Sequence, residues 1–115
     1  MKKTIIFAFR GDPMCFVHVL LNGLDLAGQG MGGKIIIEGD AVQLVEKMAR
    51  PDHFLNQLFE KSKKQSIIIG ACRACSNKLR VADSVTKAGV DLIGDMAGHP
   101  AMSEYIDQGY SVITF

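Results

Sequence analysis

Two cysteines separated by two residues, Cys72 and Cys75, form the pattern in this chain that is best suited to chemistry. They follow an apolar run and a glycine in the stretch SIIIGACRACSNKL. A Cys-x-x-Cys pair serves as a redox couple, as half of a metal site, or as two cysteines that only share a turn. Which of the three applies depends on the elements that position each sulfur.

Cys72 comes directly after the predicted strand 66–71, at the turn into a helix. The free N–H groups and the positive dipole end of a helix favour a thiolate over a thiol, and Arg73 adds a positive charge beside it. We therefore expect Cys72 to be the nucleophilic cysteine, with Arg73 stabilising its anion. Cys75 falls on the helix face that should pack on the sheet, which predicts either a packing residue or a partner that resolves an intermediate on Cys72.

The third cysteine, Cys15, begins the first predicted helix. In a doubly wound sheet the first and third strands are neighbours, so we expect Cys15 to approach Cys72 across the sheet. His18, one turn later, and His99, in the last connecting loop, are within reach of the same edge in this arrangement. Three thiols and an imidazole suit zinc or iron, although the sequence shows no second tight ligand pair. A metal- or small-ligand-binding module that uses Cys15, Cys72 and Cys75 therefore stays open as an alternative.

A Gly-Asp pair follows three of the predicted strands, with the aspartates at Asp12, Asp40 and Asp95. Asp12 precedes a proline, as expected of a residue that caps a helix, and Asp40 begins a capping-box pattern. Asp95 has no such neighbour and is expected at the same sheet edge as the cysteines. Candidate ligand-binding residues outside the Cys-x-x-Cys pair are Cys15, Asp12, Asp95 and His99.

The segment GQGMGGK, residues 28–34, formally matches two phosphate-binding glycine motifs. Both motifs require the glycines to lie between a strand and the helix that follows it. Here the glycines follow a helix and lead into a strand, so they predict the end of a helix and a turn. No nucleotide cofactor is expected.

Continuous apolar runs separated by helical patterns predict an alternating strand–helix chain. Such runs are typical of strands that are covered on both faces, and the alternation implies right-handed crossovers. The fold class expected is a three-layer α/β/α flavodoxin-like domain over residues 1–115, with a five-stranded, mainly parallel sheet. Predicted strands are 4–9, 34–39, 66–71, 110–115 and, more weakly, 90–96, and predicted helices are 14–27, 41–49, 53–63, 76–88 and 100–108.

Composition narrows the classes of function. The 115 residues carry 13 Lys and Arg against 12 Asp and Glu, so no basic surface for nucleic acid is expected. The apolar runs are too short to span a membrane. The beginning of the chain lacks the long apolar region of an export signal, which predicts a cytoplasmic protein whose cysteines are free thiols.

The chain resembles the DsrE/DsrF-like family of small sulfur-relay proteins. The resemblance covers essentially the whole chain and rests on the element order, on IIIGACRAC, and on the ending GDMAGHPAMSEYIDQGYSVITF. It implies a persulfide carried by a cysteine after the third strand, a role that by position belongs to Cys72. It also implies sulfur donors and acceptors that are proteins or small thiols, and a homo-oligomer, either a trimer or a hexamer.

Sulfur relay through Cys72 is thus the leading hypothesis from the sequence, with no cofactor and no resident metal. Cys75 or Cys15 would then resolve the persulfide as a disulfide. The alternatives are the metal- or ligand-binding module and a non-catalytic subunit of an oligomer with inert buried cysteines.

Overall fold

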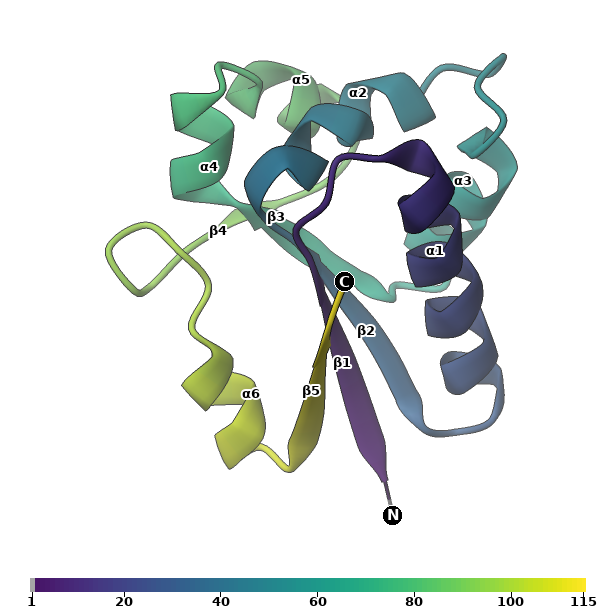
Figure 1. The fold of residues 1–115 in the computed structure, drawn as a ribbon, viewed down its shortest axis with the longest axis vertical. Coiled ribbons are helices and arrows are strands. Elements are labelled where there is room, and N and C mark those ends of the chain that lie inside the picture. Colours follow the sequence, from purple (N-terminus) through teal and green to yellow (C-terminus); the bar gives the residue numbers. More distant parts are fainter. Residues whose placement is uncertain (1) are drawn as a thin grey trace.

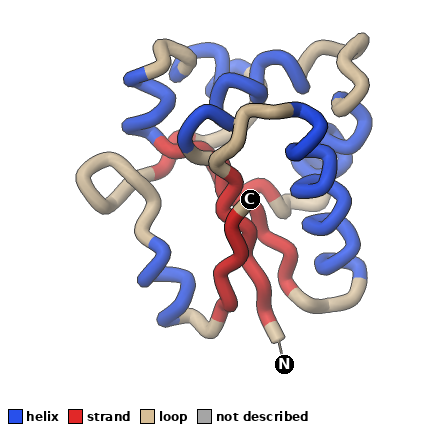
Figure 2. Tube along the Cα trace, viewed as in Figure 1, coloured by secondary structure: helices blue, strands red, loops and turns tan. Residues whose placement is uncertain are grey.

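A single five-stranded parallel sheet organises the chain. The computed structural model describes residues 2–115, and its sheet has the strand order β4-β3-β2-β1-β5 with every neighbouring pair parallel. Figures 1 and 2 show the strands side by side in the middle of the molecule, with helices on both sides. The strands are β1 (Lys3–Ala8), β2 (Gly32–Ile37), β3 (Ile68–Cys72), β4 (Leu92–Ile93) and β5 (Tyr110–Thr114). The predicted three-layer α/β/α flavodoxin-like fold is confirmed.

The two faces of the sheet are covered unequally. Alternate strand residues point to opposite faces, so Ile6 and Ile35 join a large core beneath α1 to α5, whereas Phe7 and Ile36 join a small one beneath α6. Figure 1 shows α6 on the opposite side of the sheet from α1 and α3. The helices are α1 (Pro13–Gly28), α2 (Leu44–Met48), α3 (Asn56–Lys64), α4 (Arg73–Lys78), α5 (Ala82–Lys87) and α6 (Met102–Asp107), with a 3₁₀ turn η1 (Gly39–Gln43) before α2.

The strand order corrects one expectation. β2 lies between β1 and β3, so the first and third strands are not neighbours. The chain adds β2, β3 and β4 one after another on the same side of β1, and then returns through α6 to place β5 on the other side. The first helix therefore starts one strand farther from Cys72 than predicted.

Two helical segments also differ from their predicted forms. The expected helix 76–88 is divided into α4 and α5, because Arg80 adopts a left-handed conformation with φ of 60°. The expected helix 41–49 begins as the 3₁₀ turn η1, and no side chain caps it, so Asp40 does not form the predicted capping box. The glycine-rich segment 28–34 is, as predicted, the end of α1 and the turn into β2.

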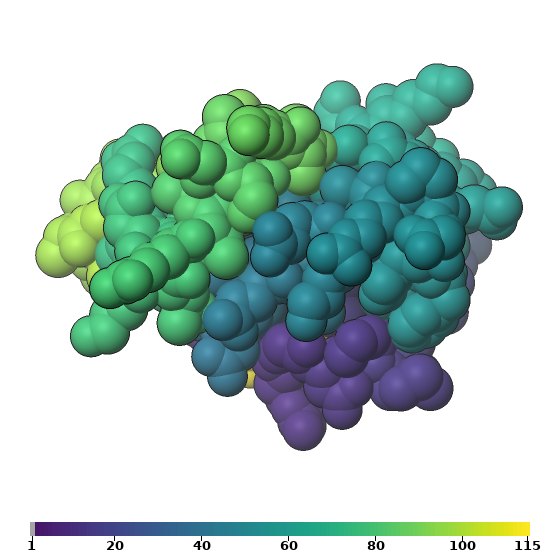
Figure 3. Space-filling view, turned by 90° about the horizontal axis from the view of Figure 1, so that it is seen from above, coloured from purple at the N-terminus to yellow at the C-terminus, as the bar shows by residue number. Residues whose placement is uncertain are grey.

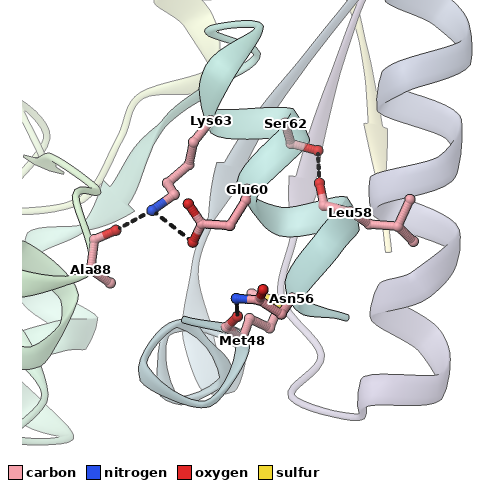
Figure 4. A network of polar contacts seen from close by, with 7 residues as sticks. All are labelled: Met48, Asn56, Leu58, Glu60, Ser62, Lys63 and Ala88. Carbon is pink, nitrogen blue, oxygen red and sulfur yellow. Dashed lines mark hydrogen bonds and ion pairs between the residues drawn. The ribbon is translucent and has the colours of Figure 1, made fainter. Parts of the chain in front are cut away.

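Polar contacts join α3 to its neighbours on the large-core face. Figure 4 shows Lys63 donating a hydrogen bond to the carbonyl oxygen of Ala88 at the end of α5, at 2.7 Å, while it pairs with Glu60 at 3.1 Å. Asn56 donates to the carbonyl oxygen of Met48 at the end of α2, at 2.8 Å. A cation and an amide thus satisfy carbonyl groups that helix ends leave without partners.

Among the described residues, no helix is both long and apolar enough to cross a membrane.

Candidate functional site

Four side chains with metal-binding atoms converge at one end of the sheet: Glu38, Cys72, Cys75 and His99. Their ligand atoms all lie within 4.8 Å of one another. Glu38 directly follows β2, Cys72 ends the adjacent β3, Cys75 lies in α4, and His99 lies in the loop after β4. Because the carboxyl ends of parallel strands meet at one edge, strand packing brings together residues that are far apart in the sequence. Figure 3 looks onto this edge and shows the segments after β1, β2 and β3 in purple, blue and green on one face.

The two thiols are held by the start of α4. Cys72 occupies the N-cap position, and its sulfur accepts a hydrogen bond from the backbone N–H of Cys75 at 3.3 Å. The Cys75 sulfur in turn accepts from the backbone N–H of Gly39, also at 3.3 Å. Each sulfur is therefore held by a backbone donor, one within α4 and one from the segment after β2.

His99 faces both sulfurs through the same ring nitrogen. Its Nδ1 lies 3.2 Å from the sulfur of Cys72 and 3.9 Å from that of Cys75. The loop that carries it is anchored by a hydrogen bond from the N–H of Ala74 to the carbonyl oxygen of Gly98, at 2.8 Å. Within the loop, a Cβ on Gly94 would overlap the carbonyl oxygen of Gly98, so this turn requires glycine.

Burial raises the pKa of two members of the cluster, Cys72 and Glu38. Cys72 is completely buried and Glu38 has an exposed fraction of 6%. Burial raises the pKa of the Cys72 thiol to about 12, and the side chains of Cys75 and Glu38 add to this rise, while the backbone N–H of Cys75 opposes it. Burial likewise raises the pKa of Glu38, partly opposed by the nearby His99. Desolvation therefore opposes the thiolate that the helix start was expected to favour at Cys72, and it outweighs the hydrogen bond to sulfur.

Arg73 and Asp95 lie apart from the sulfurs. The Arg73 guanidinium donates to the carbonyl oxygen of Leu92 at 3.0 Å. It lines a separate hollow together with Asp95 and Glu104. The predicted role of Arg73 as the cation beside the Cys72 sulfur therefore has no support from its contacts.

The residues at the start of α1 form another separate group. Asp12 caps α1, as predicted, by accepting a hydrogen bond from the N–H of Met14 at 2.9 Å, and Cys15 lies half-buried in the first turn. Neither Asp12 nor Cys15 belongs to the cluster. His18 is exposed on α1 and does not belong to it either. Of the predicted site residues, the structure brings together Cys72, Cys75 and His99.

Comparison with known proteins finds two similar proteins, both from archaea. No protein-family model matches it. It is 33% identical over 97 residues to the uncharacterized protein MJ0733 of Methanocaldococcus jannaschii, which covers 84% of this chain and 77% of that protein. The chain belongs to the MJ0733 family. An uncharacterized protein of Archaeoglobus fulgidus is 42% identical over 48 residues, covering 42% of this chain and 79% of that protein.

One solved structure shares the fold of this MJ0733-family chain. It is that of the conserved protein of unknown function BT1422 from Bacteroides thetaiotaomicron, with a TM-score of 0.72 and 20% identity. The match covers 98% of this chain and 95% of that one. At this level of identity the likeness concerns the fold.

Sequence reasoning missed Glu38 as a site residue in this MJ0733-family protein. The sequence pattern pointed to the Gly-Asp pair that follows Glu38, although Glu38 is the first charged residue after the apolar run of β2. A buried carboxylate at the carboxyl end of an inner strand is rare without a functional or ionic partner, and this was the available signal. Its proximity to the cysteines depends on β2 and β3 being neighbours, which the sequence pattern does not determine.

Two hollows flank His99. One is mainly apolar, has a volume of about 390 Å³, and includes Glu38 and His99 in its wall. The other has a volume of about 300 Å³ and includes Cys75 and His99. The cluster is therefore buried at Cys72 and open to small molecules on either side of the imidazole.

Proposed function

We propose that this chain is a metal-binding protein that holds one transition-metal ion at the cluster of Cys72, Cys75, His99 and Glu38. The observation that carries the proposal is the convergence of their ligand atoms within 4.8 Å. Thiolate, imidazole and carboxylate groups are the ligands that proteins use for zinc, and two thiolates with an imidazole also suit iron. This is the metal-binding alternative from the sequence with a different set of residues, since His99 takes the place of Cys15 and Glu38 lies beside the other three.

The separations of the ligand atoms fit a tetrahedral ion. Metal–sulfur bonds of about 2.3 Å and metal–nitrogen bonds of about 2.0–2.1 Å place sulfur and nitrogen roughly 3.5 Å apart around a tetrahedral centre. The distances from His99 Nδ1 to the two sulfurs, 3.2 and 3.9 Å, lie on either side of that value. Small side-chain adjustments would therefore bring the three atoms onto one ion.

The raised pKa of Cys72 is compatible with a ligand and unfavourable for a free nucleophile. A nucleophilic cysteine needs its thiolate to be populated in the absence of any partner. A metal ligand loses its proton when the cation arrives, because the ion itself stabilises the buried anion. A cation beside Cys72 and Glu38 would offset the desolvation of both.

A second proposal is sulfur relay. The resemblance to the DsrE/DsrF-like proteins gives the carrier role to Cys72, but the complete burial of that residue favours Cys75 as the carrier. Cys75 is half-buried and lines the hollow of about 300 Å³, whereas Cys72 is completely buried. The Cys75 thiolate would attack the terminal sulfur of a donor persulfide, and the donor would leave as a thiolate. An acceptor thiol on a protein or small molecule would then take that sulfur. Alternatively, Cys72 would form a disulfide with Cys75 and release hydrosulfide.

One set of samples tests both proposals. The protein, purified without reductant or chelator, is assayed for bound metal, and the metal-free form is then treated with a sulfane-sulfur donor and weighed intact. Wild type is compared with Cys72→Ser, Cys75→Ser and the matched control Cys15→Ser, which changes a thiol outside the cluster. About one metal ion per chain in the purified wild type and Cys15→Ser, and markedly less in Cys72→Ser and Cys75→Ser because each keeps only part of the site, supports the metal site.

The mass measurement tests the relay. An added mass on the order of 32 Da, absent only in Cys75→Ser, supports a persulfide on Cys75. No metal in the wild type, even after reconstitution with zinc under reducing conditions, would refute the first proposal. A sulfur adduct that persists in Cys75→Ser would refute the second.

We further propose that the chain assembles as a homo-oligomer, a trimer or hexamer according to the resemblance, in the cytoplasm, where free thiols persist. β5 is an edge strand whose Ile113 has an exposed fraction of 44%, and Ile106 of α6 on the thinly covered face has one of 58%. Apolar side chains beside an unpaired strand edge favour association. Light scattering during size-exclusion chromatography tests this: a monomeric mass at micromolar concentration would contradict it.

A further inference from the structure

Glu38 differs from the other three members of the cluster in its contacts. The sulfurs of Cys72 and Cys75 lie within hydrogen-bonding distance of His99 Nδ1, at 3.2 and 3.9 Å. In the described part of the chain, no hydrogen bond to the Glu38 carboxylate is present, although it lies within 4.8 Å of the other ligand atoms. The carboxylate therefore lies close to the other three side chains but forms no hydrogen bond with them.

Glu38 also forms part of a hollow that continues away from the sulfurs. The hollow has a volume of about 390 Å³. Glu38 and His99 line it together with the apolar side chains of Phe9, Met96 and Met102. A small organic molecule fits this volume, and its polar end would lie at Glu38 and His99. The side of the ion that faces Glu38 therefore opens onto a binding pocket.

We infer that the proposed metal ion has three protein ligands, Cys72, Cys75 and His99, and a fourth position that holds a water molecule within reach of Glu38. This inference rests on the proposed metal site and assigns it a reaction class, the hydrolysis of small, uncharged, largely apolar esters, amides or amidines bound in the hollow. The same division of roles occurs in zinc deaminases, where one imidazole and two thiolates hold the ion and a glutamate that is not a ligand transfers protons.

The reaction balances with water as the only co-reactant. An ion held by Cys72, Cys75 and His99 would supply Lewis-acid polarisation of the water, and Glu38 would remove one of its protons as the oxygen bonds to the electrophilic carbon of the substrate. Glu38 then returns that proton to the departing oxygen or nitrogen as its bond to carbon breaks. With an exposed fraction of 6%, Glu38 is shielded from bulk water, so its carboxylate would act on the single water molecule held beside it.

Cobalt(II) is the probe for the open position, since its thiolate charge-transfer bands report binding and its visible bands report coordination. The Co(II)-loaded protein is titrated with benzohydroxamate and acetohydroxamate, two metal-binding acids that differ in the apolar ring. We expect both to change the visible bands, with benzohydroxamate binding about tenfold tighter or more because its ring is buried in the hollow. Met96→Ala should reduce that preference and leave the affinity for Co(II) unchanged.

Glu38→Gln separates a proton-transferring group from a ligand. We expect this variant to bind Co(II) with an affinity within about threefold of wild type, and to lose about 10²-fold or more in turnover of phenyl acetate by the zinc-loaded protein. Cys15→Ser should retain wild-type turnover. The metal-free protein, which keeps its thiols, should show no turnover and so controls for direct attack by cysteine.

Each failure identifies which step of the inference is wrong. Co(II) bands that neither hydroxamate changes, or an affinity for Co(II) that falls more than about a hundredfold in Glu38→Gln, would show a closed site with Glu38 as the fourth ligand. Turnover equal to that of the metal-free protein would overturn the hydrolytic role. The absence of any charge-transfer band would instead refute the metal site itself.

Discussion

The affinity of the cluster for zinc should rise steeply with pH, and Cys72→Ser should remove about half of that dependence. Burial raises the pKa of Cys72 to about 12, so its sulfur carries a proton at neutral pH in the metal-free protein. Forming a metal–thiolate bond requires the loss of that proton. Because the pKa lies far above neutrality, the Cys72 contribution should persist without levelling between about pH 6 and pH 8.

The expected size follows from proton counting. Each proton released on binding lowers the apparent dissociation constant about tenfold per pH unit, so the two thiols together give about a hundredfold per unit. The rise in the pKa of Cys72 from 9.0 to about 12 corresponds to about 4 kcal/mol that binding must offset. Structural zinc sites supply about 10–16 kcal/mol, so the ion is still expected to bind.

The measurement is a competition between the protein and a chromophoric chelator for zinc at several pH values. Calorimetry in two buffers that differ in ionisation enthalpy counts the protons directly, with about two expected per ion in the wild type and about one in Cys72→Ser. Cys15→Ser is the matched control, because its thiol lies outside the cluster, and should reproduce the wild-type slope. An unchanged slope in Cys72→Ser, or an affinity independent of pH, would refute the assignment of Cys72 as a ligand.

Three further outcomes are expected. The metal-free wild type should lose stability relative to Cys72→Ser above about pH 9, by up to about 1.4 kcal/mol per pH unit, because the buried thiol keeps its proton while the unfolded thiol ionises. Denaturant titrations at neutral and alkaline pH measure this, and parallel curves would contradict it. Burial raises the pKa of Glu38, so the charged carboxylate is disfavoured at neutral pH. Glu38→Gln should therefore raise the melting temperature of the metal-free protein near pH 7 but not near pH 4. Equal effects at both pH values would argue against the pKa shift. Gly94→Ala should displace the loop that carries His99 and weaken zinc binding at least about tenfold, while circular dichroism shows an unchanged fold. The control Gly28→Ala, whose Cβ would meet nothing within 4 Å, should bind zinc as wild type does.

The fold was predictable because the strands are nearly continuous apolar runs and the helices between them are amphipathic. The order of the strands was not, since a crossover rule fixes its handedness but not which neighbour a strand takes. The error over Cys15 came from this gap, because β2 occupies the place next to β3 that the prediction gave to β1. β4 is the other weak point: only Leu92 and Ile93 of the predicted 90–96 form the strand.

The candidate site was half predictable for a related reason. Cys72 and Cys75 are close in the sequence, so a local pattern was enough to find them. His99 and Glu38 join them through long-range packing. Only His99 was predicted, because an imidazole in a loop is a candidate ligand whatever its neighbours. The direction of the Arg73 side chain was also beyond the sequence, since a residue next to Cys72 in the chain points away from it at the start of a helix.

A reactive thiol and a metal ligand make opposite demands on the same position. A nucleophile needs access and a populated thiolate, whereas Cys72 is completely buried and has a raised pKa. A ligand needs neither, provided that other donors converge on the same point and a cation stabilises them all. Cys75, His99 and Glu38 provide that convergence. The burial that counts against Cys72 as a free nucleophile is therefore compatible with its proposed role as a metal ligand.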